Sequence, residues 1–176
     1  MGGFCRVLLR VLVAIAAGAH RATLAACLFA LGLAGAAQLA SVALRYGFGL
    51  GYLWLNDLAA WSFAALIVLS LPVALAMDAN VRVDILRARQ GRRSQAIFDR
   101  LALVLLLFPL FSLLIWAAAP QILMSWKIGE ASAQSGGLPG YFIVRTLPGI
   151  AAALMVLQGA ARLVHRAAAS VAETRP

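Results

Sequence analysis

The sequence predicts an all-α membrane protein with four transmembrane helices, and three observations lead to this fold class. Hydrophobic residues make up 64% of the 176-residue chain and charged residues only 12%, which is about half the charged share of a soluble domain. Four apolar stretches hold a single charged residue, Arg145; they cover residues 22–44, 58–77, 101–126 and 139–161. The arginines gather almost entirely on one side of these stretches, as they do in the cytoplasmic loops of membrane proteins.

The four stretches are long enough to cross a bilayer. About 20 residues of α-helix rise ~30 Å, which is the thickness of the hydrocarbon core. With their flanking residues, we expect transmembrane helices over about residues 22–44, 55–77, 95–124 and 139–164, in one membrane domain that covers residues 1–176. Few residues remain for a soluble domain, so the function of the chain is expected within or beside the membrane.

The distribution of basic residues predicts the orientation of the chain. If the N-terminus is cytoplasmic, four spans leave three inner segments, residues 1–21, 78–100 and 162–176. Twelve of the 15 basic residues lie in them: Arg6, Arg10, Arg21, Arg82, Arg87, Arg89, Arg92, Arg93, Arg100, Arg162, Arg166 and Arg175. The outer regions keep Arg45, Lys127 and Arg145. This asymmetry predicts that both termini are cytoplasmic, and it accounts for the net charge of +9 without nucleic acid as a partner.

Two segments outside the spans have the pattern of amphipathic helices that lie along the inner leaflet. In residues 3–20 an apolar stripe lies opposite Arg6 and Arg10, which favours an interfacial helix. The alternative is a cleaved signal peptide with its apolar core over residues 7–17, although Arg10 interrupts that core. In residues 78–93 arginines and apolar residues again fall on different faces, which favours a second interfacial helix, held by anionic lipid headgroups, over a solvated basic loop.

The spans carry few residues with catalytic or ion-binding chemistry. No acidic residue falls at the centre of a span, where proton and ion pathways place them. Cys5 and Cys27 form no CxxC pair, and the terminal positions of His20 and His165 do not suit a haem-binding bundle. We therefore expect no enzyme activity, no cofactor and no metal. Such a chain is most often a subunit that packs against, anchors or orients a larger membrane partner.

Two features inside the spans are informative: a row of small residues in the first span and one charge in the fourth. Small residues form a row along the first span: Ala26, Ala30, Ala34, Ala37 and Ser41. Such a row allows helix backbones to approach closely in lipid. Arg145 lies about two turns into the fourth span, where it can extend toward the outer surface or pair with Glu130 or Asp57.

Four short motifs indicate a family. An Arg45-Tyr46 pair ends the first span, and Trp54-Leu55-Asn56-Asp57-Leu58 opens the second. The second span ends in Met77-Asp78-Ala79-Asn80-Val81-Arg82-Val83-Asp84-Ile85-Leu86, and Leu147-Pro148-Gly149-Ile150 lies early in the fourth. In this order and topology, over residues 22–164, the motifs resemble the small membrane subunit of tripartite ATP-independent periplasmic (TRAP) transporters, the DctQ-like family. The chain departs from that family at Asn56 and Asp57, where two glutamates are common, and at Asn80, where histidine is common.

The resemblance implies a specific function. The chain would be the small scaffold subunit of a sodium-coupled secondary transporter in the bacterial inner membrane. Its partners would be the large TRAP permease subunit, which carries the substrate and ion sites, a periplasmic substrate-binding protein that delivers organic acids, and membrane lipids. The small subunit would enlarge and anchor the fixed part of the permease.

The resemblance also implies structural and interface roles for particular residues. Arg45, Tyr46, Trp54 and Asp57 would fix the outer ends of the first two spans, with an Arg45–Asp57 ion pair as one option and independent anchoring at the membrane surface as the other. Arg82 and Asp84 would hold the inner horizontal helix, unless they are solvated charges. Arg145, Pro148 and Gly149 are the remaining candidates.

Three other functions stay open at this point. The first is the small subunit of a tripartite tricarboxylate transporter, which also has four spans. The second is a haem- or quinone-anchoring subunit of a membrane oxidoreductase, which a Soret band in the visible spectrum would reveal. The third is a small exporter that transports alone.

Overall fold

The structure, a computed structural model, describes residues 2–77, 101, 103–133 and 137–173. These residues form helices and loops, with no strand among them. The helices are α1 (Gly2–Phe48), α2 (Leu53–Ala76), the π-helix η1 (Leu103–Leu107), α5 (Phe108–Ile128) and α6 (Tyr141–Glu173). Four helical stretches are long and apolar enough to cross a membrane: Val11–Phe48, Leu53–Ala76, Leu103–Ile128 and Tyr141–Val164. The predicted class, an all-α protein with four spans, is confirmed.

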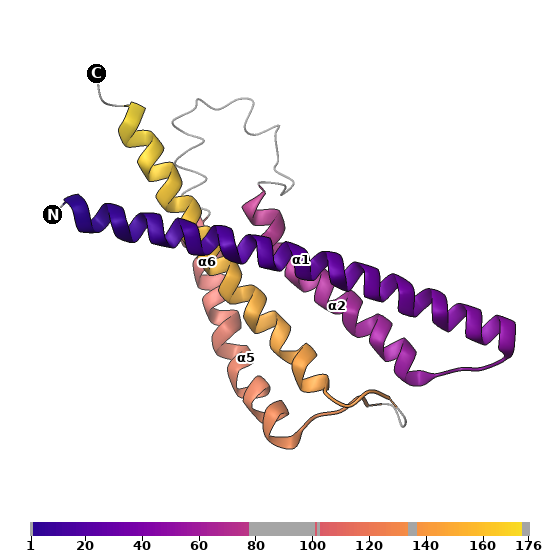
Figure 1. The fold of residues 1–176 in the computed structure, drawn as a ribbon. Coiled ribbons are helices and arrows are strands. Elements are labelled where there is room, and N and C mark those ends of the chain that lie inside the picture. The colour runs from indigo at the N-terminus through magenta and orange to yellow at the C-terminus, as the bar shows by residue number, and fades with distance from the viewer. Residues whose placement is uncertain (1, 78–100, 102, 134–136, 174–176) are drawn as a thin grey trace.

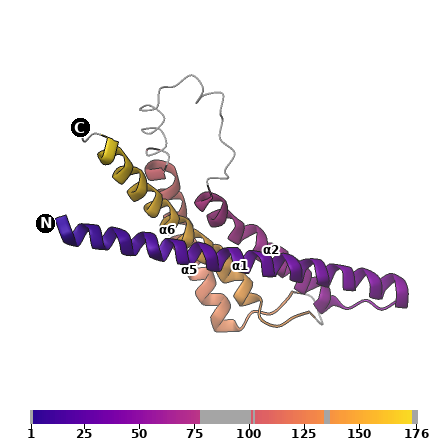
Figure 2. The ribbon, with the colours of Figure 1, turned by 45° about the horizontal axis from the view of Figure 1, so that its top comes forward.

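The helices are arranged as two antiparallel hairpins. In Figures 1 and 2, α1 lies along α2, and α5 lies along α6. Helix α6 also packs against α2, and the N-terminal half of α1 crosses α6. Helix α6 therefore holds the two hairpins together.

Helix α1 runs without a break for 47 residues. We expected a separate interfacial helix over residues 3–20 and a span from residue 22, but the structure has no helix boundary near Arg21. The reason is local: this part of the chain is rich in alanine, the strongest helix former, and has no proline. An amphipathic stripe can end without ending the helix that carries it.

The α1–α2 hairpin has an apolar core. Ala37, Leu55 and Ala59 are buried between the two helices. The small size of the two alanines lets the backbones approach closely, which favours helix association in lipid. Gly49 closes the hairpin with φ of 69°, a conformation that glycine adopts at no steric cost.

The third span begins with a π-helical turn before Pro109. Proline lacks an N–H, and its ring clashes with the carbonyl four residues earlier in an α-helix. The wider turn of η1 accommodates that ring, as π-turns often accommodate an interruption of helical hydrogen bonding. At the other end, Gly129 stops α5 in a left-handed conformation, φ 61° and ψ 45°.

The predicted interfacial segment 78–93, which includes Arg82 and Asp84, lies outside the described residues, as do residues 95–100 of the predicted third span. The predicted spans 55–77 and 139–164 correspond closely to α2 and to the first three quarters of α6. Helix α5 is little covered by the rest of the chain: in the most apolar window of Leu103–Ile128, only 6% of residues are buried.

Candidate functional site

Polar contacts join the helices at the loop end of the α5–α6 hairpin, where residues 129–140 connect the two helices. Glu130, just after α5, accepts hydrogen bonds from the Arg145 guanidinium at 2.6 and 2.7 Å, through both carboxylate oxygens. The hydroxyl of Ser125, which is only 1% exposed, donates to Oε2 of the same carboxylate at 2.6 Å. One carboxylate thus connects the last turn of α5 to the second turn of α6. Of the options open from sequence, the structure shows Arg145 paired with Glu130.

These contacts also stabilise the ionised form of Glu130. The hydrogen bond from Ser125 and then those from Arg145 hold the pKa of the Glu130 carboxyl below its ordinary value. Glu130 is therefore ionised at neutral pH, and the ion pair with Arg145 is present there.

Asp57 connects the two hairpins at this end. It is 8% exposed, and its Oδ2 accepts the main-chain N–H of Leu138 at 3.1 Å. The loop approaches so closely that a Cβ on Gly137 would overlap Asp57 Oδ2 and the side chain of Ser132. The carboxylate on α2 therefore holds the loop between α5 and α6 in place.

Arg45 does not take part in this contact. It lies in the last turn of α1, is exposed, and forms no ion pair with Asp57 in the part of the chain that the structure describes. The Arg45–Asp57 option fails because Asp57 is directed to the loop of the other hairpin.

Aromatic side chains surround the loop end of the α1–α2 hairpin. Tyr46 is 83% exposed and Trp54 is 43% exposed, and the rings of Tyr52 and Trp54 lie 6.2 Å apart. Exposed Tyr and Trp at helix ends are typical of the membrane–water boundary. This placement fits the interpretation of Tyr46 and Trp54 as interfacial anchors.

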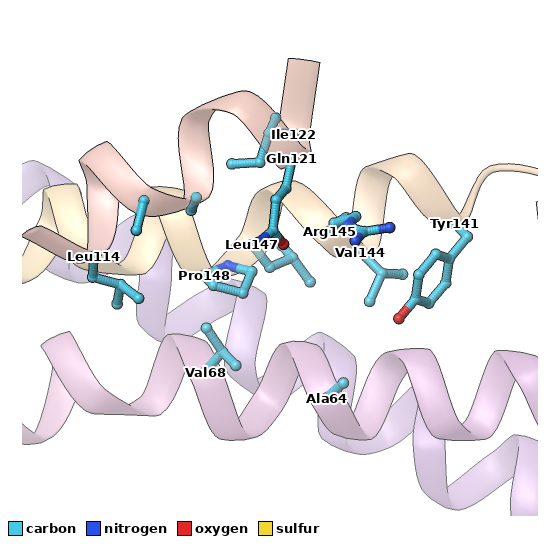
Figure 3. A pocket seen from close by; sticks show the side chains of 12 residues that line it. Ala64, Val68, Leu114, Gln121, Ile122, Tyr141, Val144, Arg145, Leu147 and Pro148 are labelled. Carbon is cyan, nitrogen blue, oxygen red and sulfur yellow. The ribbon is translucent and has the colours of Figure 1, made fainter. Parts of the chain in front are cut away.

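An apolar groove of about 440 Å³ lies between α2, α5 and α6. Figure 3 shows Val68 and Ala64 from α2 on one side, Gln121 and Ile122 from α5 on the other, and the α6 stretch from Tyr141 to Pro148 between them. Pro148 lines this groove. Gly149, beside it, allows α5 to come close, since a Cβ there would lie 3.0 Å from Ile122 Cδ1.

A buried contact that sequence reasoning missed joins the hairpins near the opposite end of the bundle. Nε2 of Gln158, a residue 7% exposed in α6, donates to the carbonyl oxygen of Ala16 in α1 at 2.8 Å. A cavity of about 350 Å³ lies beside it, lined in part by His20, whose buried Nδ1 has no hydrogen-bond partner. The sequence feature that could have indicated this contact is Gln158 itself, the single amide side chain of the fourth span. Such side chains hydrogen-bond across helices in lipid.

The described residues contain no group of three or more His, Cys, Asp or Glu side chains that could hold a metal ion. What the arrangement provides is mechanical: polar contacts near both ends of the bundle hold the two hairpins as one unit.

Comparison with models of known protein families gives a match. Residues 36–169 match the family model described as tripartite ATP-independent periplasmic transporters, DctQ component. The match covers more than half of the chain and confirms the resemblance indicated by its motifs. No curated protein and no solved structure matched the chain.

Proposed function

This chain belongs to the DctQ component family of tripartite ATP-independent periplasmic transporters, and we propose that it is the fixed scaffold on which the large permease subunit is held in the membrane. Membership makes it the small subunit of a TRAP transporter, a multi-pass protein of the inner membrane. We further propose that the permease carries the substrate and sodium sites and receives organic acids from a periplasmic solute receptor.

The observation that carries the scaffold role is the linkage of the two hairpins. Asp57 binds the α5–α6 loop at one end of the bundle, and Gln158 binds α1 near the other end. A unit held at two distant points resists internal movement. At the same time α5 leaves most of its apolar surface uncovered by its own chain, so that surface remains available to lipid or to a partner subunit.

The subunit's part in transport can be tested by reconstitution. We expect sodium-gradient-driven uptake of an organic acid, delivered by the receptor, when this chain and the permease are both present in proteoliposomes. We expect no uptake with this chain alone. Uptake by this chain alone would overturn the scaffold role and support the self-contained exporter.

A cross-link tests whether the scaffold is fixed. Cysteines replace Ala16 and Gln158, in a background where Cys5 and Cys27 are alanine, so that oxidation ties α1 to α6 at the contact described above. A fixed scaffold predicts equal uptake for the oxidised and the reduced double variant. If uptake falls on oxidation and returns on reduction, the hairpins move relative to each other during transport and the fixed role is wrong.

A further inference from the structure

A second groove, of about 390 Å³, lies on the α1–α2 hairpin. We call it the amide groove and define it by Leu31, Gly35 and Gln38 on α1 and Asn56, Ala60 and Phe63 on α2. At 100° per residue, the α2 side of this groove lies about a quarter turn from the side that carries Asp57. It is therefore separate from the groove of Figure 3, which is lined by Ala64 and Val68 on the side of α2 that carries Asp57.

The amide groove contains polar groups that the chain does not satisfy. Ser41 Oγ donates to Asn56 Oδ1 at 2.6 Å. Among the described residues, the amide nitrogen of Asn56 and both polar atoms of Gln38 have no hydrogen-bond partner, and both side chains are exposed. Gln38 precedes Tyr46 by eight residues, so it lies ~12 Å deeper along α1 than that interfacial ring. At that depth Gln38 lies within the hydrocarbon core, where no water is available to its amide, whereas Asn56, two residues from Trp54, lies nearer the membrane–water boundary.

Lipid tails cannot satisfy these amides. An amide left unpaired in hydrocarbon is costly, whereas Asn and Gln side chains hydrogen-bond readily across packed membrane helices. One face of α5 provides a contrast within the same chain: it carries the exposed side chains of Leu113, Trp116 and Leu123, and acyl chains suit such a surface. The amide groove therefore has the chemistry of a protein contact, and this face of α5 has the chemistry of a lipid contact.

The shape of the groove fits a helix. Gly35 faces open space, with no atom within 4 Å of the position its Cβ would take, and Ala60 adds little bulk opposite it. Small residues at such a point let a third backbone approach closely. We propose that a transmembrane helix of the large permease subunit seats in the amide groove and hydrogen-bonds to Gln38 and Asn56; this rests on the proposed function.

Filling the groove tests the proposal. Gly35→Leu has room within this chain and so leaves the subunit folded, but its side chain occupies the place of the partner helix. Gly18→Leu is the matched control, because it makes the same change on α1, outside the groove, also with no atom within 4 Å. Both variants are co-expressed with a tagged permease and extracted in mild detergent, and the thermal midpoint of each purified full-length variant is measured to verify folding.

We expect co-purification of Gly35→Leu to fall at least about tenfold and that of Gly18→Leu to match the unchanged chain. Gln38→Leu should also reduce co-purification, by about 3- to 15-fold, the range expected for one or two interhelical hydrogen bonds. Full co-purification of Gly35→Leu, or equal losses in both glycine variants, would overturn the amide groove as the docking site. If the unchanged chain itself fails to co-purify with the permease, the proposed function fails instead.

A cysteine at position 38 identifies the occupant. In a background where Cys5 and Cys27 are alanine, Gln38→Cys should cross-link to a helix of the permease through a short bismaleimide, when that helix carries single cysteines in turn. A cross-linked dimer of this chain in place of the permease adduct would show that a second copy occupies the groove, and would contradict the proposal.

Discussion

The carboxylate of Asp57 on α2 accepts the main-chain N–H of Leu138, 81 residues further along the chain, at 3.1 Å. This contact closes the loop end of the bundle, and we expect it to depend on an acceptor at residue 57 and not on a charge. Asp57→Ala should lower the free energy of unfolding by about 1–3 kcal/mol, because it leaves a partly buried N–H without a partner. Asp57→Asn keeps a carbonyl oxygen and should lose less. Thermal unfolding of the purified subunit in detergent measures both; equal losses would show that charge is what matters.

Gly137 should tolerate no side chain. Gly137→Ala puts a Cβ into Asp57 Oδ2 and Ser132, and we expect a loss of about 1–3 kcal/mol from overpacking. Gly51→Ala is the control, since its Cβ meets nothing within 4 Å, and it should stay within about 0.5 kcal/mol. Because residues 57 and 137 are in contact, the double variant Asp57→Ala with Gly137→Ala should lose less than the two single losses together. If the loss of stability in the double variant equals the sum of the two single losses, the close approach of residues 57 and 137 would be contradicted.

The ion pair of Glu130 should make stability depend on pH in the acid range. The pKa of Glu130 is lowered in the folded chain, so its contribution is fully present above the ordinary value of 4.5 and is lost as pH falls through the folded pKa. The thermal midpoint of the unchanged chain should therefore exceed that of Glu130→Gln at pH 7, and the difference should shrink below about pH 4.5. A difference that is constant down to pH 3 would contradict the pairing.

Gln158→Leu should weaken the junction of α1 with α6. The substitution keeps the size of the side chain but removes the donor to Ala16, and interhelical hydrogen bonds in membranes contribute about 0.6–1.7 kcal/mol. Gln121→Leu is the control, because Gln121 is exposed in α5 and its side chain forms no interhelical hydrogen bond among the described residues. Unfolding of both variants, followed by circular dichroism, makes the comparison; equal stability of the two would remove Gln158 from the contacts that hold the bundle.

The spans could be predicted from sequence because hydropathy and length determine them. The limits of α2 and the start of α6 fell within two residues of expectation. The continuity of α1 was missed, because amphipathic and apolar stretches can follow each other in one helix when no proline or cap separates them. The cytoplasmic position of both termini stays a prediction from the charge distribution.

The contacts of the candidate residues were harder to predict. The partner of Asp57 is a main-chain N–H, which no pattern of side chains reveals. For Arg145, the sequence offered two carboxylates, and only the path of the loop decides that Glu130 is the one within reach. Gln158 went unnoticed because a single amide in a span gives no indication of which helix it faces.

The length of α1 gives this subunit reach beyond the hydrocarbon core. Helix α1 has 47 residues and measures ~70 Å, against ~30 Å for the core. Its uncharged part, residues 22–44, measures ~35 Å and suits a span of modest tilt. The turns from Gly2 to Arg21 extend α1 by another ~30 Å, so this subunit reaches neighbours at or beyond the membrane surface that four helices of span length would not touch.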